Sequence, residues 1–336
     1  MKRRDFIKLA GLSTLGLGLS SPKTARILFA GDTLLGGYYN GIYGTQDELV
    51  KILKKMEHPE EIFGELRNYF KKADLVWVNL EGPIVPESAN LEKMLKKSFP
   101  LKQWERAGEI LRKAGIHLVS LANNHIYDFA GEEGLKSTLE LLETSFVGVG
   151  RGEEAYQGLI YNFNGMQLYL IALTDILDPY DMLATGDKLG VAGIPEKSSY
   201  HKSRTLALVK KNLKEAKADF KIAFLHWGPS SGSQIEPRQK QIARILLEAG
   251  ADIIVGCHSH CKQPIVHYPK QGKIKKLVAY GIGNLVFGGK QGRQPLSCAI
   301  EVELYKTSQE RWLKYQVIDF IPNARGDFKP EPIIKI

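Results

Sequence analysis

Short apolar segments recur along this chain, and a polar motif follows each of them at once. Their length and composition are typical of buried strands, and helical patterns lie between several of them. In an open α/β sheet the carboxyl ends of the strands border one crevice, so polar residues far apart in sequence meet there. Six segments have this form: 27–30 before Asp32, 75–80 before Glu81, 116–122 before Asn124-His125, 221–225 before His226, 252–255 before His258-Ser259-His260, and 277–283 before Asn284.

The order of the patterns indicates the fold class. Residues 27–122 read as β-α-β-α-β, with helices expected at 47–57, 59–72 and 101–114 and a loop at 36–44. From residue 274 onward the pattern is mostly β. A parallel core followed by consecutive strands favours an α/β protein with two mixed β-sheets packed together and helices outside. Because neither a repeat nor a linker interrupts the pattern, we predict one domain over residues 25–336.

The N-terminus has the pattern of an export signal. Arg3-Arg4-Asp5-Phe6-Ile7-Lys8 contains twin arginines, and the apolar stretch that follows, 9–19, is too short for an ordinary transmembrane helix. We therefore expect residues 1–24 to form a twin-arginine signal segment that exports the folded protein to the periplasm or the outer face of the cytoplasmic membrane. An amphipathic start or an uncleaved anchor is the alternative, because no A-x-A cleavage site precedes residue 27.

Composition excludes few classes of protein but bears on the partners. The formal net charge is +9, of which residues 1–23 contribute +4. A mild basic excess suits an anionic substrate, whereas a nucleic-acid-binding protein would be expected to show a Lys/Arg stripe with interleaved aromatics, which is missing here. Cys257 and Cys261 flank the two histidines of the His-x-His motif, but they lack C-x-x-C spacing, so we expect small apolar residues rather than zinc ligands or a disulfide.

Imidazoles and carboxylates at several strand ends predict a metal site. His258 and His260 follow one strand, His226 ends another, and Asn124 follows a third. Side chains that bind metals at three independent strand ends favour a shared ion over packing roles. Asp32 and Glu81 supply the anionic oxygens for divalent cations, and turn chemistry is the alternative explanation for both.

Three further polar residues are candidates for the chemistry. His125 follows a candidate ligand, so it is placed to act as a proton donor to a leaving group. Asp128 either orients His125 or caps the next helix, and the sequence does not separate these roles. Asn284 is a candidate for holding a substrate oxygen, although an Asn in a Gly-rich turn also has a purely local explanation.

Taken together, these motifs resemble those of the CapA family, which comprises capsule and poly-γ-glutamate biosynthesis proteins related to the calcineurin-like metallophosphoesterases. The similarity runs from about residue 27 to residue 290. In chain order the matching segments are Gly31-Asp32, Asn79-Leu80-Glu81-Gly82-Pro83, Ala122-Asn123-Asn124-His125-x-x-Asp128, His226-Trp227-Gly228, Gly250-Ala251-Asp252, Gly256-x-His258-x-His260 and Tyr280-x-x-Gly283-Asn284. The resemblance implies a four-layer αββα metallophosphatase-like sandwich.

The resemblance also implies roles for the candidate residues. One ion would lie among Asp32, Glu81 and His260, and Glu81 would bridge to a second ion. The second ion would be held by Glu81, Asn124, His226 and His258, with His125 as the general acid. The chain departs from the phosphoesterase pattern at Leu34, where a histidine is usual, so one of the two metal sites is poorer in ligands. Ser230 and Ser259 depart from the CapA pattern itself, where Glu and Pro are usual.

The functional expectation is an exported metal-dependent hydrolase of the CapA type. It would use one or two divalent metal ions, with manganese, iron and zinc all allowed by mixed oxygen and imidazole ligands. Its substrate would be a phosphoester or an anionic poly-γ-glutamate or cell-envelope polymer, and membrane-associated export or capsule machinery is an expected partner. The alternative is a non-catalytic envelope protein that binds or guides an acidic polymer during export or attachment.

Overall fold

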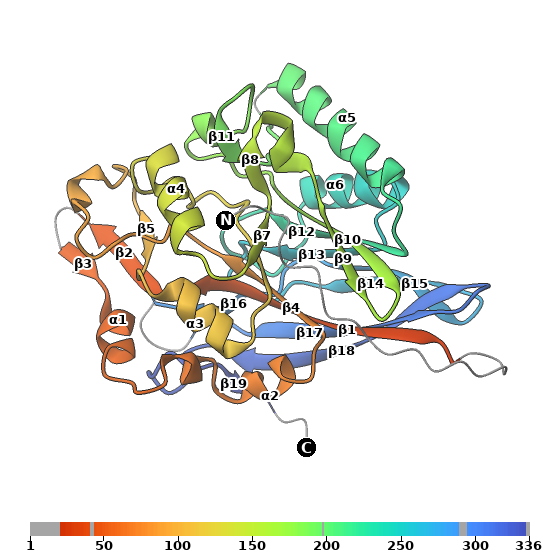
Figure 1. Ribbon diagram of the computed structural model, residues 1–336, viewed down its shortest axis with the longest axis horizontal. Helices are drawn as coiled ribbons and strands as arrows, with labels where there is room; N and C mark the ends of the chain where they lie inside the picture. The colour runs from red at the N-terminus through yellow and green to blue at the C-terminus, as the bar shows by residue number, and fades with distance from the viewer. Residues whose placement is uncertain (1–20, 41–43, 197, 289–293, 334–336) are drawn as a thin grey trace.

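The computed structural model describes residues 21–40, 44–196, 198–288 and 294–333 (Figure 1). The twin-arginine motif and the apolar stretch after it lie outside the described residues. None of the described helices combines the length and the apolar character that crossing a membrane would require.

Two groups of strands form the centre of the molecule. The first group runs in the order β7-β6-β4-β1-β17-β18, with parallel pairing from β7 to β1 and antiparallel pairing beyond. Its members are β1 (Lys23–Leu34), β4 (Leu75–Leu80), β6 (Leu118–Ser120), β7 (Ser145–Val147), β17 (Ser297–Lys306) and β18 (Arg311–Ile321), with β16 (Asn284–Phe287) beside β1 and β19 (Glu331–Pro332) beside β18.

The second group runs in the order β15-β13-β12-β10-β9 and is parallel from β15 to β10. Its members are β9 (Leu159–Phe163), β10 (Met166–Thr174), β12 (Phe220–His226), β13 (Ile253–Cys257) and β15 (Lys273–Ala279), with β14 (Ile265–Lys270) antiparallel to β15. The pairing of Ile274 with Leu313 joins β15 to β18. The two mixed sheets expected from the sequence are therefore two halves of one hydrogen-bonded sheet, which folds so that its halves face each other.

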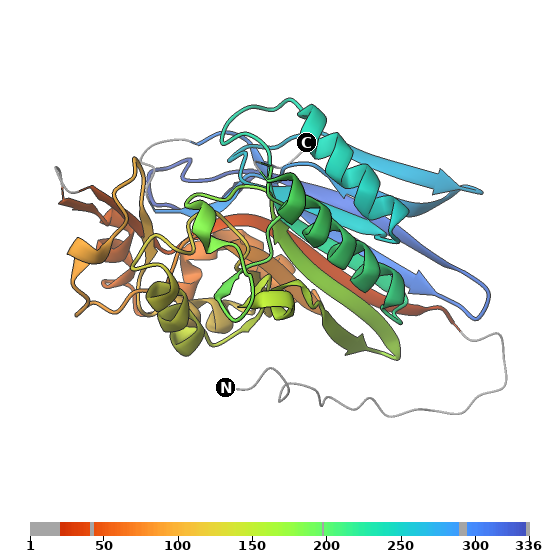
Figure 2. The same ribbon diagram turned by 90° about the horizontal axis from the view of Figure 1, so that it is seen from above.

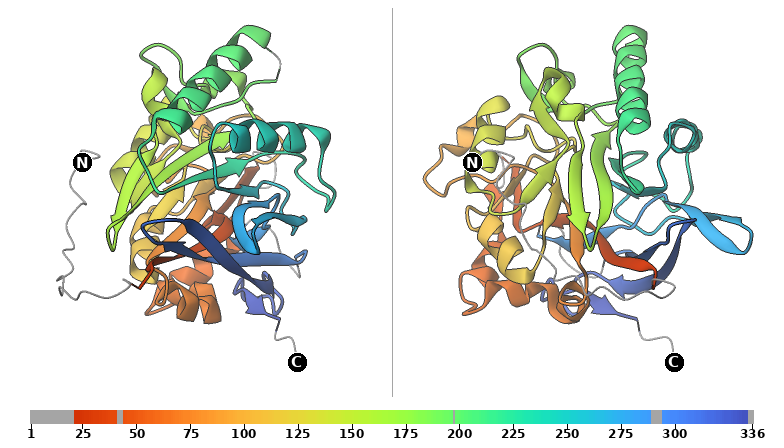
Figure 3. Two further views of the ribbon diagram at one scale, coloured as in Figure 1. Left: turned by 90° about the vertical axis from the view of Figure 1, so that its right-hand side faces the viewer. Right: turned by 45° about the vertical axis from the view of Figure 1, so that its right-hand side comes forward.

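Apolar side chains fill three layers, and these layers define the four-layer αββα arrangement. The middle layer lies between the two sheet halves, where Phe29, Trp77 and Phe224 meet with ring centroids 5.3–6.4 Å apart. One outer layer packs the first half against helices that include α1 (Glu48–Leu53) and α3 (Ala107–Ala114). The other packs the second half against α5 (Ser199–Glu215) and α6 (Pro237–Glu248). Figure 3 shows α5 and α6 on one side of the strands and the orange helices on the other.

The helices are short except for α5 and α6, which lie side by side in Figure 2. Helix α6 begins at Pro237, a favoured first helical residue, and Glu236 and Gln239 form a capping box there. The α-helices are α1 (Glu48–Leu53), α2 (Arg67–Phe70), α3 (Ala107–Ala114), α4 (Glu132–Leu141), α5 (Ser199–Glu215) and α6 (Pro237–Glu248). The 3₁₀ helices are Pro59–Leu66, Leu91–Lys93, Gly152–Tyr156 and Tyr180–Met182.

Three local expectations were wrong, each because tertiary contacts outweigh local pattern. The helix expected at 101–114 begins only at α3, and β5 (Leu101–Gln103) pairs instead with β2 (Gly36–Asn40). Residues 36–44, expected as a loop, therefore contribute a strand that also pairs with β3 (Gly44–Gln46). The helix expected at 59–72 is broken at Gly64, whose φ of 53° lies outside the helical region.

Strands β8 (Val149–Arg151) and β11 (Leu189–Val191) form a small separate ribbon.

Candidate functional site: a buried metal-ligand cluster

The candidate ligands converge where the two sheet halves meet. Asp32 on β1 is in register with Asn284 of β16 on one side and with Asn79 of β4 on the other. On the facing half, His226 at the end of β12 is in register with Cys257 at the end of β13. The carboxyl ends of strands from both halves therefore contribute to one site, as the parallel pairing predicts.

Ligand atoms of six residues in this site form three groups, and within each group they lie within 4.8 Å of one another. The first group is Asp32, Glu81 and His260, and the second is Glu81, His226 and His258. These correspond to the two ligand sets that the resemblance implied, with Asn124 beside the second. The third group, Asp32, His226 and Cys257, includes a cysteine that sequence analysis had set aside.

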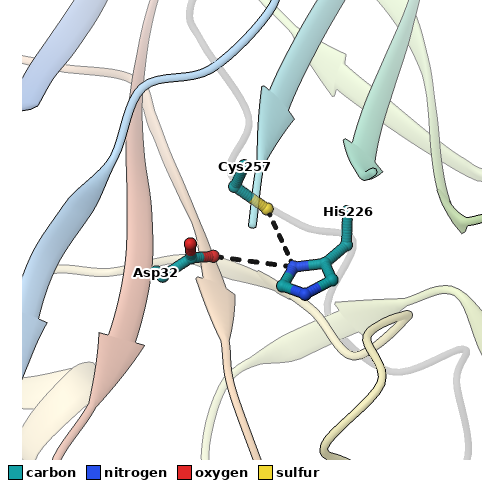
Figure 4. Close-up of side chains that lie close together, drawn as sticks. All are labelled: Asp32, His226 and Cys257. Carbon is teal, nitrogen blue, oxygen red and sulfur yellow. Dashed lines mark hydrogen bonds and ion pairs between the residues drawn. The ribbon is translucent and has the colours of Figure 1, made fainter. Parts of the chain in front are cut away.

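His226 lies at the centre of the cluster and is completely buried. Its Nε2 lies 2.7 Å from Asn124 Oδ1 and 3.9 Å from Glu81 Oε1. Its Nδ1 lies 3.2 Å from Cys257 Sγ and 3.6 Å from Asp32 Oδ1 (Figure 4). The two ring nitrogens thus face different ligand groups.

The His258-Ser259-His260 motif has a strained backbone. His258 and His260 have φ values of 87° and 51°, a region that costs a non-glycine residue about 1–3 kcal/mol. The His258 amide donates to Asp32 Oδ2 at 2.9 Å, which holds the turn against β1. Nδ1 of His258 is buried and has no hydrogen-bond partner among the described residues. A buried nitrogen in that position, beside carboxylates, fits a metal ligand.

The electrostatics of the cluster suit a cation. Burial alone would raise the pKa of Asp32, but the neighbouring His226 and His260 and the amide of His258 lower it below the ordinary value. Burial lowers the pKa of His258 well below its usual value, so the ring is neutral and keeps a lone pair. Burial also raises the pKa of the Cys257 thiol, and the charges of Asp32 and Glu81 act in the same direction.

His125 lies beside the cluster and is oriented by Asp128. His125 Nδ1 is 2.6 Å from Asp128 Oδ2, and its Nε2 is 3.7 Å from Glu81 Oε1. The N-cap of α4 is Gly131, so Asp128 does not cap this helix. Of the two roles considered for Asp128, the structure shows the contact with His125. Lys97 Nζ lies 2.6 Å from Asp128 Oδ1. Burial raises the pKa of Asp128 to about 7 and lowers that of His125 well below its usual value.

Asn284 supports a histidine in this geometry. Its Oδ1 lies 2.8 Å from His260 Nδ1, and its Nδ2 donates to Gln294 Oε1 at 2.7 Å. Both ends of the amide are therefore engaged within the protein. This arrangement orients His260, and it differs from the substrate contact expected from the sequence.

Asn79 and Gln103 help to hold the site together, although no role for them was predicted from the sequence. Asn79 Nδ2 donates to Asp32 Oδ1 at 2.8 Å, and an amide at the end of a fully buried strand was the available signal. Gln103 bonds three backbone groups, at Thr33, Leu35 and Glu81. Leu34 packs in an apolar cluster with Leu101 and Phe287 and offers no ligand.

The comparison with family models decides the classification. The model described as bacterial capsule synthesis protein PGA_cap matches residues 26–289. The chain belongs to this family. It is 27% identical to the "Capsule biosynthesis protein CapA" of Bacillus anthracis over 277 residues, which cover 81% of this chain and 63% of that protein. It is 26% identical to the "PGA biosynthesis protein CapA" of Bacillus subtilis (strain 168) over 289 residues, which cover 84% of this chain and 69% of that one.

The PGA_cap chain thus spans less than two thirds of the length of the Bacillus anthracis relative. Among solved structures, TT1561 of Thermus thermophilus aligns with a TM-score of 0.41 and 11% identity, covering 87% of this chain and 99% of that one. A structure of PhoD aligns with a TM-score of 0.38 and 8% identity over 96% of this chain and 74% of that one. The four-layer assignment of this PGA_cap protein comes from its own strand order and core layers.

Proposed function

We propose that this PGA_cap protein is an exported metal-dependent hydrolase of the CapA type, acting in the metabolism of capsule, poly-γ-glutamate or another cell-envelope polymer. The observation that carries the proposal is the convergence of two carboxylates and three imidazoles, from both sheet halves, into groups no wider than 4.8 Å. A packing role does not account for five buried or nearly buried ionisable groups at one point, since burying such groups without a counter-ion is costly.

The same residues would hold the ions. Asp32, Glu81 and His260 form one triad of ligands, and Glu81, His226 and His258 form the other, so Glu81 is shared. Divalent ions bound there supply Lewis-acid polarisation of the scissile group and lower the pKa of water. Asn79 and the His258 amide fix the orientation of the Asp32 carboxylate.

His125 would act as the proton donor. Asp128 holds the Nδ1 side of the ring, which leaves Nε2 facing the site. The contact of Nδ1 with the Asp128 carboxylate favours a proton on Nδ1. Burial lowers the pKa of His125, and an anionic substrate beside Nε2 would favour the second proton there. General acid catalysis of this kind contributes about 10²–10⁴-fold to a rate.

Substrate, location and partners follow from the family and the charge. Two relatives carry names in capsule or PGA biosynthesis, and the formal charge that remains outside residues 1–23, +9 less +4, is still basic and suits an anionic polymer or a phosphoester. The twin-arginine motif favours export, and capsule or export machinery at the membrane would then be the partner. Fusion of residues 1–24 to a reporter tests this part: a reporter that stays in the cytoplasm contradicts export.

The enzyme proposal is tested first by elemental analysis of protein purified without chelator. We expect manganese, iron or zinc at one or two ions per chain, and the absence of any divalent metal would contradict the proposal. Metal-loaded protein is then assayed on an aryl phosphodiester. His125→Ala should keep its metal and lose turnover by about 10²-fold or more. His267→Ala is the matched control, since His267 is exposed on β14 and contacts Tyr315.

A second function is favoured by the packing of Leu34. Leu34 offers no ligand at the position where the phosphoesterase pattern has a histidine, and a site with fewer ligands favours binding over catalysis. In this second function the protein would use the same cluster to bind and guide an acidic polymer, without turnover. Binding of polyglutamate, together with no hydrolysis of any ester or amide by metal-loaded protein, would support this function and contradict the enzyme.

A further inference from the structure

Cys257 places a sulfur atom among the candidate ligands. Cys257 and His226 are in register on adjacent parallel strands, so their side chains leave the sheet on the same face. Asp32 reaches the same point from β1 in the other half of the sheet. Figure 4 shows the three side chains pointing toward one another, and all three are completely buried.

The distances from His226 Nδ1 to its two neighbours are close to those of a coordination shell, and all three ligand atoms lie within 4.8 Å of one another. Zinc binds sulfur at about 2.3 Å and nitrogen at about 2.0–2.1 Å, so neighbouring ligand atoms around a tetrahedral ion lie about 3.3–3.6 Å apart. Here Cys257 Sγ is 3.2 Å from His226 Nδ1, and Nδ1 is 3.6 Å from Asp32 Oδ1. An ion could therefore bind among them with side-chain shifts of a few tenths of an ångström, estimated from the same bond lengths.

The hydrogen bonds of His226 indicate which ring nitrogen is available. The amide nitrogen of Asn79 lies 3.3 Å from Nδ1, and a side-chain amide NH₂ can only donate, so Nδ1 is the acceptor. The amide oxygen of Asn124 lies 2.7 Å from Nε2, so this nitrogen faces the ligand group that contains Glu81. Nδ1 faces Asp32 and Cys257 and would bind the ion in place of its contact with Asn79.

We propose that Cys257 is a metal ligand, and that a divalent ion with affinity for sulfur binds between Asp32, His226 and Cys257. The inference rests on the proposed metal site and narrows the class of ion to zinc or iron, because thiolate ligands favour these ions whereas manganese prefers oxygen ligands. As the sulfur–metal bond forms, the thiol proton passes to solvent. Cys298, which is also buried in the middle core layer, belongs to none of the ligand groups found among the described residues and serves as a control.

Spectroscopy on the full chain tests this assignment directly. Protein loaded with cobalt(II) should show a thiolate-to-metal charge-transfer band in the near ultraviolet, and Cys298→Ala should keep the band. Cys257→Ala should lose the band and bind zinc at least about tenfold more weakly, the lower end of the loss seen even for outer-shell partners of a metal. X-ray absorption of the zinc-loaded unmodified protein needs no variant and should detect sulfur at about 2.3 Å.

The outcomes separate this inference from the proposed function. Cobalt or zinc bound with only nitrogen and oxygen neighbours overturns the role of Cys257 and leaves the proposed metal centre intact. Failure to bind any divalent ion overturns both. If Cys257→Ala does not fold, the X-ray absorption spectrum of the unmodified protein still decides the matter.

Discussion

A buried ion pair beneath the His226-Trp227-Gly228 turn gives a sharp test of how the site is supported. Arg238 on α6 donates from Nε to Asp175 Oδ2 at 2.7 Å and from Nη2 to the Ile194 carbonyl at 2.8 Å. The Asp175 carboxylate is only 1% exposed and also accepts from the Gly228 amide. Arg238→Met would therefore leave a buried carboxylate without its counter-ion.

The cost can be estimated from the burial. Removing one partner of a buried pair costs about 3–5 kcal/mol. Taking a urea slope of about 3 kcal/mol per M, the unfolding midpoint should fall by about 1 M or more. Burial already raises the pKa of Asp175, and without Arg238 it rises further. A carboxyl whose pKa is raised in the folded state favours folding at low pH. The loss of stability in Arg238→Met should therefore be complete at neutral pH and become smaller as the pH falls through the pKa of Asp175 in the folded protein.

Urea unfolding followed by circular dichroism, with matched controls, measures this effect. Arg244 lies on the same helix and forms an exposed ion pair with Glu248, with Nε 3.9 Å from Oε1. Arg244→Met should therefore lower the free energy of unfolding by less than about 0.5 kcal/mol. Adding Asp175→Asn to Arg238→Met should recover most of the loss, because the new amide still accepts from Gly228. Equal stability of Arg238→Met and the parent protein, or no recovery in the double variant, would refute the reasoning.

Three other substitutions test the frame around the ligands. Gln103→Leu removes three hydrogen bonds to buried backbone groups, at about 1–3 kcal/mol each. Urea unfolding should therefore show a loss of stability of at least about 3 kcal/mol. A loss below about 1 kcal/mol would contradict the structural role of these three bonds. Gly31→Ala puts a Cβ 1.7 Å from the Gly283 carbonyl oxygen, so no folded soluble protein is expected, and a native circular dichroism spectrum would contradict this. Lys97→Met removes the partner of the buried Asp128 and should lower the free energy of unfolding by about 3 kcal/mol at about pH 8. The loss should be smaller at about pH 6, because a carboxyl with a pKa of about 7 is protonated there. A loss of stability that does not vary with pH would contradict the ion pair.

The sequence was sufficient for the parts of the fold that local pattern determines. The apolar run at 75–80, interrupted by Asn79, became β4 with the same bounds, because a strand buried on both faces needs mostly apolar side chains. Helix α6 begins at Pro237 with its capping box in place, and both are features that local sequence determines. The convergence of the strand ends also followed, since parallel strands place their carboxyl ends at one edge.

Contacts between distant segments explain what the sequence did not predict. Residues 101–103 have a helical neighbourhood but lie against β2, where Gln103 finds three backbone partners that no local pattern reveals. The two sheet halves are joined where Ile274 pairs with Leu313, a contact between distant segments that no local pattern reveals. Nothing in the sequence distinguishes Lys97 and Arg238 from the other basic residues; their buried partners Asp128 and Asp175 do.

Cys257 was expected to be a small apolar residue, but the structure places it in a group of candidate metal ligands. Spacing along the chain tests whether two cysteines can bind one ion, but it cannot test a set that combines one cysteine with residues from other strands. Asp32 and Cys257 lie far apart in the sequence and on different sheet halves, yet both flank the same ring nitrogen of His226. The strained turn at His258 and His260 follows directly after Cys257, so the backbone that directs the two imidazoles also fixes the sulfur. Any ion bound at this cluster must therefore either accept the sulfur as a ligand or lie far enough toward Glu81 to avoid it, and the nature of the metal depends on which of these occurs.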